Sequence, residues 1–307
     1  MFRKLSLLLF AGSLATTIPQ WTHPQGQLFT GRPRLSDHYY WPFKKDIRQF
    51  ERATTSIPIP YGDIWIKDVA PVVTSRLVKF RYSPDYLPKK QSAALESAFS
   101  DWIDQQHFDY LKSAIILDGG NCIYNGRDTV IITTRVLQDN PAYSRSALIQ
   151  TLKSQLQVTH VILIAPEPGD VLGHADGQVH FLSPDCLLLG DFSGHQKIKQ
   201  QLQRALPQTT IIDLPSSYQA AGQYDSEIPS AKGLYINMTE TTSTVYVPQY
   251  GLKMDQAIIK LVQHHTSKKV QAVDVTHLST LGGSVNCLTW YCPNNLLPAQ
   301  LKKHANS

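Results

Sequence analysis

Residues 160–205 read HVILIAPEPGDVLGHADGQVHFLSPDCLLLGDFSGHQKIKQQLQRA and contain one complete unit of the predicted fold. His160–Ile164 and Cys186–Leu189 are short β-rich runs that predict strands, and Ser183-Pro184-Asp185 predicts a hairpin turn before the second. Gly173-His174-Ala175-Asp176 forms a polar turn between the first strand and the hairpin. Helical spacing follows over His195–Ala205. The unit is therefore strand, polar turn, hairpin and helix.

The same order of elements recurs along the chain. Further strands are predicted at Ala114–Leu117, Thr129–Thr133, Leu234–Ile236, Thr244–Val247, Val270–Val275 and around Cys287, and further helices at Gln91–Gln106, Ser144–Gln155 and Lys253–His265. Asn125-Gly126 is a hairpin-turn signal. Polar landmarks recur at intervals of 53, 55, 61 and 50 residues, namely Asp68, Asn121, Asp176, Asn237 and Cys287. We therefore predict about five mixed β/α units whose polar turns meet at a common axis. No G-x-G-x-x-G motif opens a helix, which excludes a βαβ dinucleotide fold.

Composition predicts a globular α/β protein with one large domain. Of 307 residues, 42% are hydrophobic and 17% are charged, and no Pro/Gly/Ser-rich linker divides the chain. The net charge of +5 is spread along the sequence without a long Lys/Arg run. We therefore expect no nucleic-acid partner and no stable membrane insertion. A homodimer remains open.

The N-terminus allows two interpretations. Residues 1–4 are short and positive, residues 5–15 are apolar but too short to span a bilayer, and Ser13 and Ala15 are small residues at signal-peptidase positions. Residues 1–15 are thus either a signal peptide of a secreted or periplasmic protein, or an apolar first strand or helix of a cytoplasmic one. If residues 1–15 are a signal peptide, the single domain covers residues 16–307. Four cysteines suit two disulfides or a reducing compartment equally well.

Two segments place a carboxylate beside an aromatic residue or beside two glycines. In Trp65-Ile66-Lys67-Asp68-Val69-Ala70-Pro71, an extended chain before the proline would let the Trp65 ring and the Asp68 carboxylate converge on a flat cation. Ordinary surface packing is the alternative. Asp118-Gly119-Gly120-Asn121-Cys122 would let backbone approach a neighbour closely, although a plain tight turn also fits.

Two further segments carry groups suited to acid–base and nucleophilic chemistry. In an extended Gly173–Asp176, His174 and Asp176 point the same way, and a carboxylate stabilises an imidazolium; a non-catalytic polar pair is the alternative. Leu281–Trp290 places Cys287 after a double glycine, at the start of an apolar strand. A reactive thiolate there needs a nearby cation, either His174 or a bound guanidinium. The alternatives are an inert buried thiol or a Cys287–Cys292 disulfide.

Taken in order, these motifs resemble the agmatine deiminase and bacterial (Porphyromonas-type) peptidylarginine deiminase family of the guanidine-modifying enzymes. The family pattern W-x-R-D-x-G-P, E-G-G-N, G-H-x-D and G-G-x-x-N-x-C resembles the segments that begin at Trp65, Asp118, Gly173 and Gly282, although no residue separates Asn286 from Cys287 here. Tyr235–Asn237 and Val247–Gly251 resemble the family's Y-x-N and V-V-P-Q-F-G stretches, so the similarity runs from about Pro19 to Pro293.

The resemblance implies a five-bladed α/β propeller (pentein) with a central active site. It implies Cys287 as nucleophile, His174 as general acid/base, and Asp68 and Asp176 as ligands of the guanidinium nitrogens. Substrate binding would also involve Trp65, Asp118, Asn121 and Asn237. Such chemistry passes through a covalent thiouronium and requires no metal or organic cofactor.

Three departures from the family pattern keep the substrate open: Lys67 replaces Arg, Ala70 replaces Gly, and Asp118 replaces Glu. The first hypothesis is deimination of agmatine to N-carbamoylputrescine, a step of putrescine biosynthesis. The second is deimination of arginine in peptides, where a C-terminal carboxylate would need a basic anchor such as Lys89-Lys90, Arg76 or Arg81. The third is a propeller that binds a guanidinium without turnover.

Overall fold

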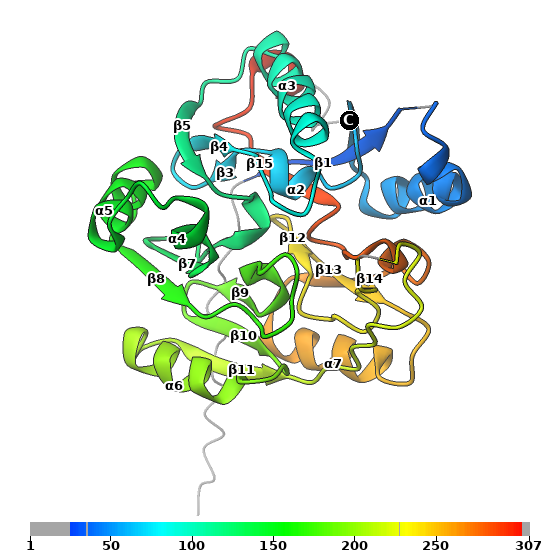
Figure 1. Cartoon of the computed structure of the whole chain (residues 1–307). Helices are drawn as coiled ribbons and strands as arrows, with labels where there is room; N and C mark the ends of the chain where they lie inside the picture. The colour runs from blue at the N-terminus through cyan, green and yellow to red at the C-terminus, as the bar shows by residue number, and fades with distance from the viewer. Residues whose placement is uncertain (1–24, 35, 227, 303–307) are drawn as a thin grey trace, which may run out of the picture.

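The computed structural model describes residues 25–34, 36–226 and 228–302, and the candidate signal peptide at residues 1–15 lies outside these ranges. Within them the chain forms five three-stranded sheets (Figure 1). In sheet order the strands are β15–β1–β2 (Thr289–Pro293, Gly26–Pro33, Ile57–Gly62), β3–β4–β5 (Val72–Val73, Leu77–Arg81, Leu111–Ile116), β6–β7–β8 (Cys122–Tyr124, Thr129–Thr133, His160–Ile164), β9–β10–β11 (Val179–Ser183, Cys186–Gly190, Thr210–Leu214) and β12–β13–β14 (Thr239–Glu240, Thr244–Gln249, Lys269–Asp274).

All five sheets share one pattern of pairing. The middle strand pairs antiparallel with one neighbour and parallel with the other, as β10 does with β9 and β11. A parallel pair needs a crossover, which a helix supplies between the second and third strand of each unit. The sheet of β15, β1 and β2 joins the C-terminal part of the chain to the N-terminal part. The predicted repeat of about five units is therefore present in the described residues.

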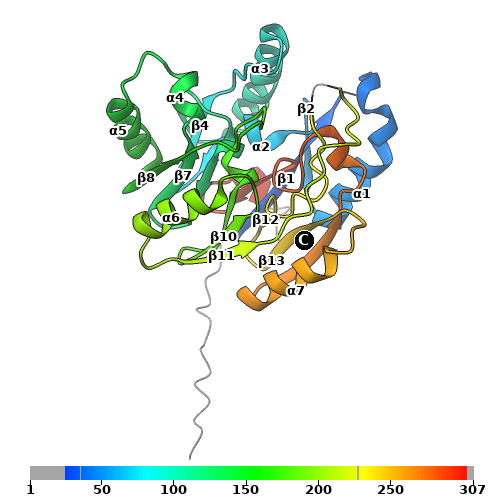
Figure 2. The ribbon, with the colours of Figure 1, turned by 60° about the horizontal axis from the view of Figure 1, so that its bottom comes forward.

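The crossover helices lie around the rim, outside the sheets (Figures 1 and 2). They are α1 (Lys44–Thr54), α3 (Lys89–Gln105), α5 (Arg145–Leu156), α6 (His195–Ala205) and α7 (Asp255–His265). In α5, Leu148, Leu152 and Leu156 are fully buried at four-residue spacing, and the side chain of Ser144 caps the helix by accepting from the N–H of Ala147. Shorter elements are α2 (Ile66–Val69), α4 (Arg135–Asp139), α8 (Ala299–Lys302), η1 (His38–Phe43), η2 (Gly119–Asn121), η3 (Ala175–Gly177) and η4 (Leu278–Leu281).

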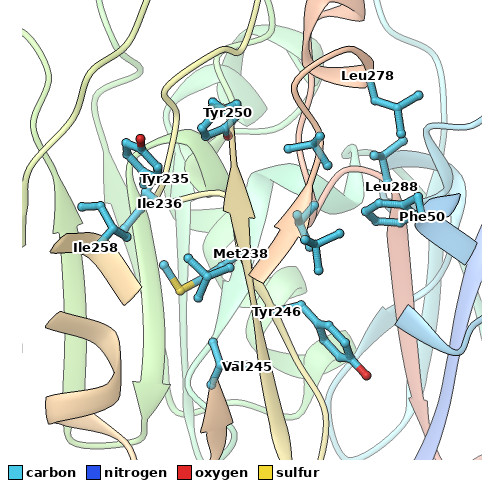
Figure 3. Packing of buried hydrophobic residues seen from close by; sticks show 14 of the residues in the cluster. Phe50, Tyr235, Ile236, Met238, Val245, Tyr246, Tyr250, Ile258, Leu278 and Leu288 are labelled. Carbon is cyan, nitrogen blue, oxygen red and sulfur yellow. The ribbon is translucent and has the colours of Figure 1, made fainter. Parts of the chain in front are cut away.

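The largest core cluster packs between neighbouring units. Figure 3 shows Met238, Val245 and Ile258 on one side and Phe50 and Leu288 on the other. Burial of such side chains contributes about 1.5–3 kcal/mol each.

No helix among residues 25–34, 36–226 and 228–302 has the length and apolarity to cross a bilayer.

The predicted helices and most predicted strands are confirmed, but one predicted strand is absent, and strands β1 to β4, strand β11 and helix α1 were not predicted. Leu234–Ile236 is a turn rather than a strand, closed by hydrogen bonds from the N–H of Leu234 to Ala231 O (3.1 Å) and of Asn237 to Leu234 O (3.3 Å). Its apolar residues are buried in the core, which imitates a strand signal. Helix α1 was not predicted, because only Ile47, Phe50 and Thr54 of its 11 residues are buried.

Candidate active site

Each sheet is preceded by a short polar segment that enters its first strand. These segments are α2, η2, η3, the turn at Asn237, and the turn at Cys287 after η4. They contact one another through backbone as well as side chains: the N–H of Lys67 donates to Cys287 O (3.2 Å), and the N–H of Asn286 donates to Asn237 O (3.2 Å). Equivalent positions of the repeat thus meet at one place.

Local conformation differs from the prediction in two of these segments. Trp65–Asp68 is not extended: Trp65 precedes one turn of helix over Ile66–Val69, and the chain becomes extended only at Ala70, directly before the proline. His174 is extended, but Asp176 lies in the 3₁₀ turn η3. Both short turns still direct Asp68 and Asp176 toward His174.

Cys287 lies in a turn and not in a strand. The N–H of Leu288 donates to Ser284 O (3.1 Å) and that of Thr289 to Asn286 O (3.1 Å), so β15 begins only at Thr289. All four cysteines are free thiols, and the Cys287–Cys292 disulfide and the two-disulfide alternative are therefore wrong for this structure. The turn leaves Cys287 only 6% exposed.

Polar contacts fix the thiol. Its Sγ lies 3.6 Å from Oδ2 of Asp176 and 3.4 Å from Oδ1 of Asn237. The same Asn237 oxygen accepts from the N–H groups of Asn286 (3.0 Å) and Cys287 (3.3 Å). Asn286, which the sequence reasoning did not single out, donates from Nδ2 to Asp176 Oδ2 at 2.8 Å. Asn237 and Asn286 together place the carboxylate beside the thiol.

His174 is surrounded by carboxylates. Its Nε2 lies 3.2 Å from Oδ2 of Asp118, and its Nδ1 lies 3.6 Å from Oδ1 of Asp68. The N–H of Gly120 donates to Asp68 Oδ1 at 3.1 Å. A Cβ at Gly120 would come within 2.7 Å of Asp68, 2.9 Å of His174 and 3.1 Å of Asp176. The second glycine of Gly119-Gly120 is thus required for the close approach of these groups.

Burial and charge set the protonation states. Burial alone would lower the pKa of His174, but Asp68, Asp118 and Asp176 outweigh it and raise this pKa to about 10. Burial, with Asp118 and Asp176, raises the pKa of Asp68 to about 7 against the opposing effect of His174. Burial, then Asp176 and Asp68, raises the pKa of the Cys287 thiol well above its usual value. At neutral pH the unliganded site therefore holds an imidazolium and a protonated thiol.

A cavity of about 230 Å³ reaches this cluster from outside. Four predicted site residues line it: His174, Asp176, Asn237 and Cys287. Asp68 and Asp118 are not among its lining residues, and both contact His174. The loop before Gly173 contributes Glu167 and Asp170, two acidic residues that the sequence reasoning missed although they precede the His174 motif by only a few positions.

Two other predicted residues, Trp65 and Asn121, do not line the cavity. The Trp65 ring packs against Gly283, where a Cβ would come within 2.4 Å of Trp65 Cζ3 and 3.1 Å of Cys287 Cβ. The Asn121 amide oxygen accepts from the N–H of Thr133 at 2.9 Å and so anchors β7 to η2. None of the basic residues considered as anchors, Arg76, Arg81, Lys89 and Lys90, lines the cavity.

Over residues 25–34, 36–226 and 228–302, no group of three or more His, Cys, Asp and Glu side chains has an arrangement that could hold a metal ion.

Comparison with solved structures shows which fold the chain has. A solved agmatine deiminase of Enterococcus faecalis superposes with a TM-score of 0.73 at 20% identity, covering 90% of this chain and 95% of that one. DDAH from Pseudomonas aeruginosa superposes with a TM-score of 0.59 at 14% identity, covering 87% and 100% of the two chains. These likenesses show the mixed α/β fold.

Sequence comparison gives the family. A curated protein of Enterococcus faecalis, named as a candidate agmatine deiminase, is 23% identical over 292 residues, which cover 80% of this chain and 79% of that protein. The model of the Porphyromonas-type peptidyl-arginine deiminase family matches residues 39–293. The chain belongs to this family. It is a hydrolase that acts on carbon–nitrogen bonds.

Proposed function

We propose that this enzyme hydrolyses the guanidinium group of agmatine through a covalent intermediate on Cys287, giving N-carbamoylputrescine and ammonia. The observation that carries the proposal is the juxtaposition of Cys287 Sγ with Asp176 (3.6 Å), in a cavity that His174 also lines. The five sheets are, in this proposal, the blades of a pseudo-fivefold propeller with the site at its centre.

The substrate cation supplies what the resting thiol lacks. Asp176 and Asp68 are proposed to hold the guanidinium nitrogens, which orients the planar group and offsets their negative charge beside Cys287. Asp176 and Asp68 both raise the pKa of the thiol in the empty site. A bound cation reverses this effect, so the thiol releases its proton to solvent and a thiolate forms when a guanidinium is present.

The chemical steps then follow from the groups present. The thiolate of Cys287 adds to the guanidinium carbon, the carbon–nitrogen bond breaks, and the imidazolium of His174 gives its proton to the departing ammonia. A thiouronium on Cys287 remains. Neutral His174 takes a proton from water, which attacks the thiouronium carbon. The sulfur–carbon bond then breaks, the proton of the new hydroxyl goes to the departing sulfur, and the neutral ureido product leaves. Water is the only co-reactant.

The charge of the cavity favours agmatine over peptidylarginine. Glu167 and Asp170 line the cavity, and none of its described lining residues is Lys or Arg. Agmatine carries an ammonium at its far end, which two carboxylates attract, whereas the free carboxylate of a C-terminal peptidylarginine or of free arginine would be repelled. The family description keeps arginine in peptides as the alternative substrate.

Ammonia release from agmatine, free arginine and arginyl peptides tests the proposal, with Cys287→Ala as the inactive control. We expect the highest kcat/KM with agmatine, and a drop of roughly tenfold for agmatine in Glu167→Gln/Asp170→Asn. A higher kcat/KM with arginyl peptides would show that peptidylarginine, and not agmatine, is the substrate. Agmatine binding by calorimetry without ammonia release would support a non-catalytic guanidinium-binding protein.

A further inference from the structure

The carboxylate of Asp118 contacts Tyr86 as well as His174. Its Oδ2 lies 3.2 Å from His174 Nε2 and accepts a hydrogen bond from the Tyr86 hydroxyl at 3.3 Å. Its Oδ1 is buried and makes no hydrogen bond within the described ranges. Oδ2 of Asp118 therefore contacts both partners, the imidazolium of His174 and the neutral hydroxyl of Tyr86.

Tyr86 lies on a loop with its own anchor. The loop runs from the end of β4 to Pro88, which precedes α3. Next to Tyr86, Asp85 forms an ion pair with Arg135, whose Nε also pairs with Asp139 at 3.0 Å. Arg135 Nη1 donates to Val171 O at 3.4 Å, so the same side chain reaches the loop before Gly173. The backbone around Tyr86 is thus tied to the active-site wall.

The environment of the Tyr86 hydroxyl suits a hydrogen-bond donor. Burial, followed by the charge of Asp118, raises the pKa of Tyr86 well above its usual value, and a side-chain hydrogen bond with Tyr82 contributes less, so the hydroxyl keeps its proton. A donor is what a short carboxylate needs here: Asp118 replaces the glutamate of the family pattern and is one methylene shorter. Without a second contact, its carboxylate could turn away from His174.

We propose that Tyr86 is a positioning residue that holds the Asp118 carboxylate against His174. Tyr86 does not line the cavity and acts only through Asp118. The proposal rests on the deiminase function proposed above, because Asp118 affects the reaction through the proton that His174 carries.

The charged and titratable groups around His174 come from several segments. Asp68 faces it from α2, Asp118 from before η2, and Asp176 from η3, with Cys287 beyond Asp176. Behind Asp118 lie Tyr86, Tyr82, Lys79 and Asp139, all of which interact electrostatically with it. Loss of the Asp118 hydrogen bond removes one of the contributions that raise the pKa of His174.

The direct test is an NMR titration of the His174 imidazole in the full-length wild type, Tyr86→Phe and Tyr110→Phe, with His174→Asn to assign the resonance among the 11 histidines. We expect Tyr86→Phe to titrate about half a pH unit or more below the wild type. Tyr110→Phe is the matched control, because the Tyr110 hydroxyl donates to Asp104 at an exposed position. Equal titration of the wild type and Tyr86→Phe would overturn the proposal.

A double-mutant cycle supplies the kinetic readout. Tyr86→Phe should lower kcat for agmatine roughly fivefold with little change in KM, and should cost nothing further in an Asp118→Asn background. An undiminished cost in that background would contradict action through Asp118. If Tyr86→Phe fails to fold, Tyr86→Met replaces it in both experiments. Since the titration needs no turnover, an inactive wild type would refute the deiminase function separately.

Discussion

Cys287 is surrounded by groups that keep its sulfur protonated until a cation arrives. In the unliganded protein we expect iodoacetamide at pH 7 to modify Cys287 no faster than the partly exposed Cys186. Asp176→Asn removes the nearest negative charge, and the rate at Cys287 should rise several-fold relative to Cys186. Peptide mass spectrometry measures both thiols in one sample. Rapid alkylation of Cys287 in the empty wild type would contradict this view.

Asp68 and His174 determine the pH dependence. Asp68, with its pKa raised to about 7, must be ionised to hold a guanidinium, so kcat/KM for agmatine should rise as pH passes through about 7. His174, with its pKa raised to about 10, must be protonated to release ammonia, so the rate should fall as pH passes through about 10. An activity maximum between these values is expected from ammonia release across pH. A maximum near pH 5 would be inconsistent with both assignments.

At this scale the sequence could identify residue types but not all of their contacts. Cys287, His174 and Asp176 are recognisable from short motifs, and they do line one cavity. The place of Asn286 could not be predicted, because it depends on which side chain from η3 its amide meets. Glu167 and Asp170 likewise become cavity residues only through the path of the loop that carries them.

The short turn η2 brings the backbone into the charged cluster. Gly120→Ala should lower kcat/KM by about 100-fold or more, since its Cβ would displace Asp68, His174 and Asp176. Gly194→Ala is the control: its left-handed backbone (φ +89°) is strained by a side chain at a cost of about 1 kcal/mol, but no atom lies within 4 Å of the added Cβ. Ammonia release and thermal unfolding are measured for both. A fully active Gly120→Ala would contradict the close packing described here.

Elements with strong periodicity were predictable, and short polar turns were not. The limits of α6, β7 and β8 agree with the periodic runs at His195–Ala205, Thr129–Thr133 and His160–Ile164. The helical turn at Ile66–Val69 and the turn at Cys287 are too short to have a period. Their conformation is set by tertiary contacts such as the hydrogen bond from Lys67 N–H to Cys287 O.

Contacts between sheets differ in burial, and we expect them to differ in their contribution to stability. Glu240 of β12 contacts His180 of β9 (3.3 Å) and Lys268 (2.5 Å), and Glu240 and Lys268 are buried. Glu240→Gln should lower the free energy of unfolding by about 3 kcal/mol, because the buried ammonium of Lys268 loses its ion pair with the Glu240 carboxylate. Asp185→Asn removes the exposed pair with Arg127, which also links two sheets, and should cost less than about 1 kcal/mol. Urea unfolding that ranks the two variants the other way would contradict this.

The arrangement of the whole molecule was only partly accessible from the sequence. The spacing of Asp68, Asn121, Asp176, Asn237 and Cys287 indicated a repeat, and the five sheets repeat one pairing pattern. The pairing of β15 with β1, which connects the two ends of the described chain, has no local signal, because it depends on a contact between distant segments.

The central claim is a covalent intermediate on Cys287, and rapid quenching of the enzyme with agmatine followed by intact and peptide mass spectrometry tests it most directly. We predict that a peptide containing Cys287 gains the mass of agmatine less that of ammonia, and that Cys287→Ala gains nothing. Turnover of agmatine without an adduct at any quench time, or turnover that persists in Cys287→Ala, would contradict the account.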